Sequence, residues 1–190
     1  MPGRGWRRCR RAAAVLACLP ALLAPPGPAA ADVAWTERVG AWSVSLYRGE
    51  RGDAWCGWTT MWSDAASGLG RSVSLQMRGG EAVLFLFFDG GGTSGLTQGS
   101  QLALEIDGTS AVVKADFVRW LPNGFLMARG VLAGDAAARG RLVAMVSGAS
   151  SLRLALPDGS AWTLEPSGLA QTAAALDRCM GALEPGGPPG

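Results

Sequence analysis

Apolar and polar residues alternate along much of the chain from residue 42 onward. Trp42, Val44 and Leu46 are separated by polar residues, which is the pattern of a strand with one buried face. Asp107-Gly108 is a strong signal for a two-residue hairpin turn. The pattern predicts about eight short strands, mostly in antiparallel meanders. They include residues 54–62, 73–77, 82–88, 102–106, 111–120 and 125–131.

Helical spacing replaces this alternation twice in the last third of the chain. Residues 133–147 are predicted to form a helix that Asp135 caps, with Leu142 and Val146 in its apolar stripe. Ser167 is predicted to cap a second helix, which carries Cys179. Because strands and helices do not alternate regularly, the predicted fold class is α+β, mainly an antiparallel β meander with two helices in the C-terminal third.

The first 31 residues follow a third pattern, that of a secretory signal. Arginines precede an apolar run over residues 12–24, which is too short to span a bilayer, and small residues then lead to Ala31. We expect a signal peptide over 1–31, cleaved between Ala31 and Asp32, and hence a periplasmic or secreted protein. The alternative is a lipoprotein anchored through Cys18, because residues 15–18 resemble a bacterial lipobox.

The remainder is predicted to be one α+β domain over residues 32–184, followed by a disordered tail over 185–190. Of 17 basic and 15 acidic residues, five arginines lie in the predicted signal, so 12 basic and 15 acidic residues remain. This balance and the lack of a basic stripe argue against nucleic-acid binding. Outside the signal no apolar run approaches the ~20 residues of a membrane-spanning helix, so no transmembrane span is expected in the mature chain.

The chain contains no histidine. This removes the commonest general base and the commonest metal ligand, and it excludes Ser-His-Asp and Cys-His catalytic groups within the chain. The sequence predicts no metal site and no cofactor. Acids and serines are the only abundant reactive groups, so a carboxylate-based enzyme or an enzyme inhibitor stays open as an alternative to a non-catalytic protein.

Two of the four cysteines, Cys56 and Cys179, lie beyond the predicted signal. An even pair in an exported protein predicts a disulfide, and the alternative is two buried free thiols. A bond between them would close a loop of more than a hundred residues. Such a loop stabilises a fold by up to about 4–5 kcal/mol in the chain-entropy account.

The order of these features resembles a family of small exported proteins. A tryptophan-led strand at residues 40–44 precedes a cysteine on the next strand, and the chain ends with a helix that carries Ala175-Leu176 and Cys179. This order resembles small alphaproteobacterial proteins similar to the invasion-associated locus B family. The resemblance implies a periplasmic or surface-associated protein with a host or envelope role and without enzyme activity.

Five of the eight tryptophans lie between residues 35 and 62. By strand alternation Trp58 and Trp62 share the face of Cys56 and are expected in the core, whereas Trp55 points the other way. Trp35 and Trp55 are therefore the candidate binding residues. We expect a non-catalytic envelope or secreted protein that binds a protein partner or a cell-wall component.

Overall fold

The computed structural model describes residues 32–49, 52–65, 68–89 and 95–183. The predicted signal peptide with Cys18 and Ala31 lies outside the described residues. The predicted tail over 185–190 lies outside them as well.

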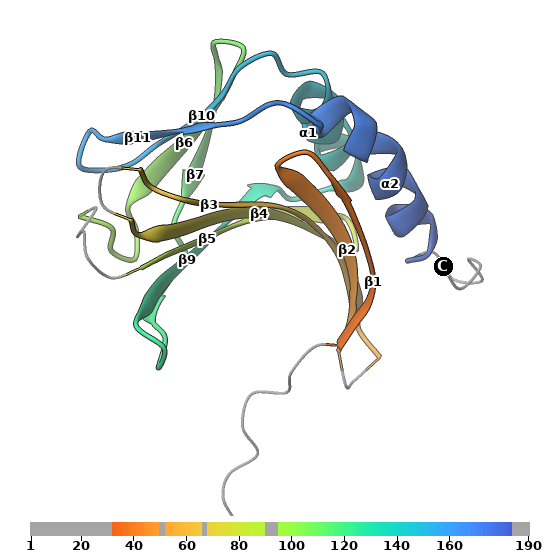
Figure 1. Ribbon diagram of the computed structural model, residues 1–190, viewed down its shortest axis with the longest axis horizontal. Helices are drawn as coiled ribbons and strands as arrows, with labels where there is room; N and C mark the ends of the chain where they lie inside the picture. The colour runs from red at the N-terminus through yellow and green to blue at the C-terminus, as the bar shows by residue number, and fades with distance from the viewer. Residues whose placement is uncertain (1–31, 50–51, 66–67, 90–94, 184–190) are drawn as a thin grey trace, which may run out of the picture.

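Eleven strands in two antiparallel sheets and two helices make up the described part of the chain (Figure 1). The strand meander with two helices in the C-terminal third confirms the predicted fold class. The seven-stranded sheet has the order β1 (Asp32–Val39), β2 (Trp42–Arg48), β3 (Ala54–Ser63), β4 (Gly70–Arg78), β5 (Glu81–Asp89), β9 (Phe125–Ala133) and β8 (Phe117–Trp120). The four-stranded sheet has the order β11 (Ala161–Leu164), β10 (Leu152–Ala155), β6 (Gln101–Ile106) and β7 (Thr109–Lys114). The helices are α1 (Ala136–Ser147) and α2 (Leu169–Gly181).

The strands of the larger sheet are arched, and the smaller sheet and both helices lie on the convex side of the arch (Figure 1). The hydrophobic core fills the space between these layers. Trp42 and Trp58 are fully buried there, and both indole nitrogens have acceptors near α2. Trp42 Nε1 donates to the Glu165 carbonyl oxygen at 2.6 Å, and Trp58 Nε1 donates to Thr172 Oγ1 at 2.9 Å. The buried donors are thereby satisfied, as burial requires.

β1 is a strand that sequence alternation did not predict. It pairs with β2 as the edge of the larger sheet, with a register shift between Val33 and Trp35. Its inward positions include Glu37, which breaks the apolar series between Trp35 and Val39. An ion pair between Glu37 and Arg178 of α2 accounts for an acid at this position.

The strand predicted over residues 111–120 is two strands in different sheets. β7 ends at Lys114 and pairs with β6, and the chain then enters the larger sheet, where β8 pairs with β9. Gly130 of β9 makes this crossing sterically feasible. A Cβ at position 130 would lie 2.6 Å from the Lys114 carbonyl oxygen and 2.7 Å from Val113 Cγ2.

The two helices begin at different kinds of cap. Asp135 caps α1 as predicted, because its carboxylate accepts the Ala138 backbone N–H at 2.7 Å. The prediction for α2 is wrong by one residue, because Gly168 rather than Ser167 is the N-cap. Gly168 has a φ of 92°, and a Cβ there would lie 2.4 Å from the Val39 carbonyl oxygen. Close approach of the β1–β2 turn therefore requires glycine at this position.

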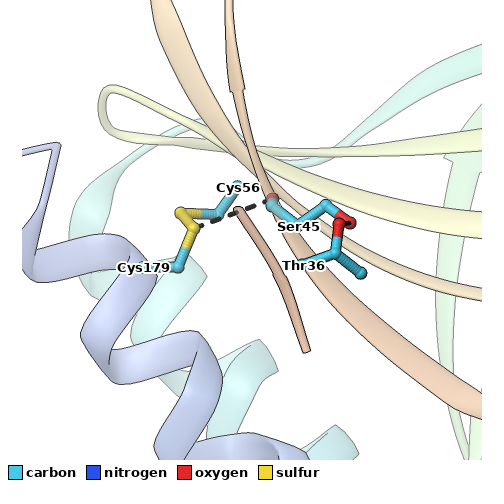
Figure 2. The surroundings of a disulfide bond; sticks show 4 residues. All are labelled: Thr36, Ser45, Cys56 and Cys179. Atoms are coloured by element: carbon cyan, nitrogen blue, oxygen red, sulfur yellow. Dashed lines mark hydrogen bonds between the residues drawn. A yellow bond between two sulfur atoms is a disulfide. The ribbon is translucent and has the colours of Figure 1, made fainter. Parts of the chain in front are cut away.

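Cys56 of β3 and Cys179 of α2 form the predicted disulfide, with 123 residues of sequence separation (Figure 2). Both residues are buried, and Cys179 Sγ lies 3.7 Å from the Ser45 carbonyl oxygen. The alternative of two free thiols is wrong. The bond fixes the last helix to the β2–β3 part of the larger sheet.

Candidate binding surface

The tryptophans predicted for the core lie on the convex, core-facing side of the larger sheet. Trp58 is fully buried, and Trp62 is partly buried with its ring edge-to-face against Trp162 at 5.7 Å between centroids. These positions agree with the face expected from the alternation around Cys56.

Trp55 lies on the opposite, concave side of the sheet, as its sequence position predicted. Its ring stacks on Tyr47 of β2 at 5.4 Å and 12°, and the Arg78 guanidinium of β4 lies 4.8 Å from its centroid. Because β2 and β4 flank β3, the two neighbours cover Trp55 from opposite sides. Trp55 Nε1 is buried and has no hydrogen-bond partner among the described residues. The residue therefore offers an unused donor but no free ring face, and its role in binding stays a prediction.

Trp35 lies on the other face of the sheet, in register with the buried Leu46. It is half-buried and lines a cleft of about 170 Å³ between β1 and α2, beside Cys179 and the ion pair of Glu37 with Arg178. This volume is below the range of about 300–1,000 Å³ that small-molecule sites have. The structure therefore does not bring Trp35 and Trp55 together, and the role of Trp35 in binding also stays a prediction.

We call the concave side of the larger sheet the open face, because none of the other described elements covers it in Figure 1. Strand register divides it into two bands. The first, the hydroxyl band, comprises alternate residues of β2, β3 and β4. Its members are Ser43, Ser45, Thr59, Ser72 and Ser74.

Hydroxyl groups of this band bind one another and the sheet backbone. Thr59 Oγ1 and Ser74 Oγ are 2.8 Å apart, and Ser43 Oγ donates to the Thr59 carbonyl oxygen at 3.3 Å. Ser45 Oγ lies 2.8 Å from Thr36 Oγ1 of β1 (Figure 2). Much of the hydrogen-bonding capacity of the band is therefore used within the protein.

The second part of the open face, the apolar band, lies on β5, β9 and β8. Its members are half-buried apart from one buried valine, although no described element packs over them. They are Val83, Phe85, Phe87, Phe117, Phe125 and Met127. The rings of Phe85 and Phe87 are stacked, with centroids 6.3 Å apart and an interplanar angle of 10°. The band therefore presents core-like side chains on a face that no described element covers.

Two arginines are interleaved with the apolar band. Arg129 stands in register between Phe85 and Phe117, and Asp116 accepts hydrogen bonds from its Nε and Nη2 at 3.0 and 2.9 Å. The side-chain hydrogen bond to Asp116 raises the pKa of Arg129 above its ordinary value. Arg119, in register with Met127, is exposed and forms no ion pair within the described residues.

A cleft of about 430 Å³ adjoins the apolar band at β8. Residues 95–98 form one wall, and Val118, Arg119, Trp120 and Leu126 contribute to the remainder. Trp120 is 52% exposed. Sequence reasoning missed this tryptophan as a site residue. Trp120 ends the strand predicted over residues 111–120, but nothing in the pattern showed that this part of it forms a sheet edge.

Five acids of the described residues form ion pairs with arginines. The pairs are Asp53–Arg78, Asp64–Arg71, Glu105–Arg153, Asp116–Arg129 and Glu37–Arg178. Hydrogen bonds from Ser150 and Ser151 lower the pKa of Asp107, and those from Ser160 lower the pKa of Asp158.

Within the described ranges, no three His, Cys, Asp or Glu side chains are grouped to hold a metal, and no helix has the length and apolarity to cross a membrane.

Comparison with known proteins assigns the chain to no family. No protein-family model matches it, and neither the curated proteins nor the solved structures contain a match. The resemblance to the invasion-associated locus B family therefore stays a prediction.

Proposed function

We propose that the protein is a non-catalytic binding protein of the periplasm or the extracellular space, and that it binds a protein partner through the open face. The observation that carries this proposal is the apolar band. Its phenylalanines and methionine belong to residue types that are enriched at protein interfaces, as is the arginine that accompanies them. Contiguous apolar surface that the fold leaves uncovered often marks a site of interaction with another protein.

The location rests on the disulfide and on the predicted signal. A disulfide between Cys56 and Cys179 persists in an oxidising compartment and is uncommon in the cytosol. The pattern of residues 1–31 and the resemblance to exported alphaproteobacterial proteins support the same location.

A cell-wall component is the less favoured ligand. Its hydroxyl groups would need unused donors and acceptors, but Ser43, Thr59 and Ser74 of the hydroxyl band already bind within the sheet. A carboxylate enzyme is also less favoured, because five acids are held in ion pairs with arginines and hydrogen bonds from serines lower the pKa of Asp107 and of Asp158. A general acid of the carboxylate kind ordinarily needs a raised pKa.

In vivo photo-crosslinking tests the proposal. A photoreactive residue replaces Phe117 in the apolar band, or Val112 of β7 as a control, which is 63% exposed on the smaller sheet. We expect a discrete crosslinked protein from position 117 that is absent from position 112 and is lost when Phe85→Ser is added. Equal crosslinking from both positions, or crosslinking that survives Phe85→Ser, would contradict the proposal.

A further inference from the structure

One edge of strand β8 pairs with no other described strand. β8 is the last strand of the larger sheet and, within the described part of the chain, pairs with β9 alone. The Leu121 N–H, one residue beyond β8, donates to the Phe125 carbonyl oxygen at 2.7 Å. Hydrogen-bonded pairs alternate along an antiparallel ladder, so the N–H and C=O groups of Val118 and Trp120 point away from β9. These groups face the open edge and are available to another strand.

The opposite edge of the sheet differs in ways that discourage pairing. β1 has a register shift between Val33 and Trp35, and it carries the charged residues Glu37 and Arg38. Bulges and charges are devices by which edge strands avoid further partners. At β8, by contrast, both residues with outward-pointing backbone groups are apolar.

The cleft beside Trp120 lies next to this open edge. Val118 and Trp120 both line it, and Leu96 and Leu126 supply buried apolar surface. Its volume of about 430 Å³ lies within the range of ligand sites. In neighbouring strands alternate residues share one face of the sheet. If another strand pairs with β8, its side chains on the face of Val118 and Trp120 would therefore enter the cleft.

We propose that the binding partner contributes an extended polypeptide segment, which pairs with β8 as an additional strand and places an apolar side chain in the cleft beside Trp120. This inference rests on the proposed function, since it assumes a protein partner. An open strand edge selects an extended backbone, because only such a backbone offers donors and acceptors at the required spacing.

Arg119 adds a charge requirement to the segment. Arg119 lies between Val118 and Trp120 in the sequence, so its side chain projects from the opposite face of β8. That face is the open face, where the apolar band begins. It is exposed and unpaired within the described residues, so an acid on the facing side of the added strand would complement it. The segment therefore alternates an apolar residue for the cleft with an acid for Arg119.

Selection from a random peptide display library, followed by fluorescence anisotropy with the selected synthetic peptides, tests this inference. We expect peptides that alternate apolar and acidic residues. Val118→Pro removes an outward N–H without removing a hydrogen bond to β9, and it should weaken binding about tenfold. Val118→Ala, which keeps the N–H, is the matched control and should weaken it less. Trp120→Ala should weaken binding about thirtyfold, as loss of an aromatic anchor does.

Hydrogen exchange on the wild-type protein supplies a measurement that does not depend on the proline variant folding. Bound peptide should slow exchange of the Val118 and Trp120 amides at least about tenfold. A library that yields no binders overturns the inference. Binders that neither slow the exchange of these amides nor lose affinity in Val118→Pro overturn it as well. If position 117 of the otherwise wild-type protein gives a crosslinked partner but no such peptide is found, the added strand alone is refuted, whereas absence of any crosslinked protein from position 117 would refute the proposed function.

Discussion

Removal of the Cys56–Cys179 disulfide should destabilise the protein more than any other change to two side chains that the structure suggests. The perturbation is the double variant Cys56→Ala/Cys179→Ala in a chain that begins at Asp32 and so contains no other cysteine. The effect should arise largely in the unfolded state, because without the bond the chain between the two cysteines is no longer held as a closed loop.

The magnitude follows from the separation of 123 residues between the two cysteines. In the chain-entropy account a loop of this length restricts the unfolded chain by about 5 kcal/mol at 25 °C. Both side chains are buried in the native core, so their truncation adds about 1 kcal/mol each from lost apolar contacts. Domains are stable by about 5–15 kcal/mol, so the variant should lie close to the limit of folding.

Urea unfolding followed by tryptophan fluorescence measures this loss. The oxidised wild type, the reduced wild type and the double variant are compared, and free thiols are counted on denatured, unreduced protein. We expect no free thiol in the wild type and a midpoint lower by about 3.5 M in the variant, since a loss of about 7 kcal/mol is divided by a urea m-value of about 2 kcal/mol/M. Two free thiols, or a midpoint within about 0.3 M of the wild type, would refute the reasoning.

Three further substitutions test particular contacts. Gly130→Ala should lower the free energy of unfolding by about 1–3 kcal/mol, because the added Cβ overlaps the Lys114 carbonyl oxygen. Gly134→Ala is the control and should not lower it, because the space around that Cβ is open. Equal effects of the two substitutions in urea unfolding would contradict the account of the crossing. Gly140→Ala in α1, also with open space, should raise stability by about 0.5–1 kcal/mol, and a loss would show an unseen contact. The hydrogen bonds from Ser150 and Ser151 to the ionised Asp107 carboxylate lower its pKa and stabilise the folded state. This stabilisation is complete at pH values above the ordinary pKa of 3.8, and it is lost as the pH falls through the lowered pKa. Asp107→Asn should therefore reduce the fall in urea midpoint below about pH 5, and an unchanged profile would count against the role of Ser150 and Ser151.

The sequence predicted those elements whose own residues determine them. Alternation of Trp42, Val44 and Leu46 located β2, Asp107-Gly108 located the β6–β7 hairpin, and Asp135 marked the start of α1. In each case the signal is local, since a strand face, a turn and a cap depend on neighbours within a few residues. The disulfide was predicted because only two cysteines remained to be paired.

The failures concern features that depend on distant parts of the chain. β1 was missed because Glu37 interrupts its inward series, and only α2, through Arg178, explains an acid there. The change of sheet after Lys114 was missed because no break in alternation marks it, although Gly130 on the other strand makes it sterically feasible. The cap at Gly168 depends on the approach of Val39. Single-sequence patterns contain no information on such pairings.

The candidate site was predicted least well, and the reason is also non-local. Trp55 was assigned to the correct face, but its ring is covered by Tyr47 and Arg78, which come from the two adjacent strands. Phe85 and Phe87 belong to the strand predicted over residues 82–88, whose apolar residues on both faces indicate burial. A two-sided apolar strand predicts burial only if both faces are covered, and β5 is covered on one.

The disulfide and the proposed binding surface lie in different parts of the same sheet, which makes stability and binding separable. Cys179 fixes α2 to β2 and β3, whereas the apolar band and the open edge lie on β5, β9 and β8. If the double cysteine variant retains about 2 kcal/mol of stability, more than about 95% of its molecules are folded. Its affinity for a β8-binding peptide should then equal that of the wild type within about twofold, as measured by anisotropy. A larger loss in the folded variant would mean that the attachment of α2 to β3 affects the sheet as far as β8, and that the two regions form one cooperative unit.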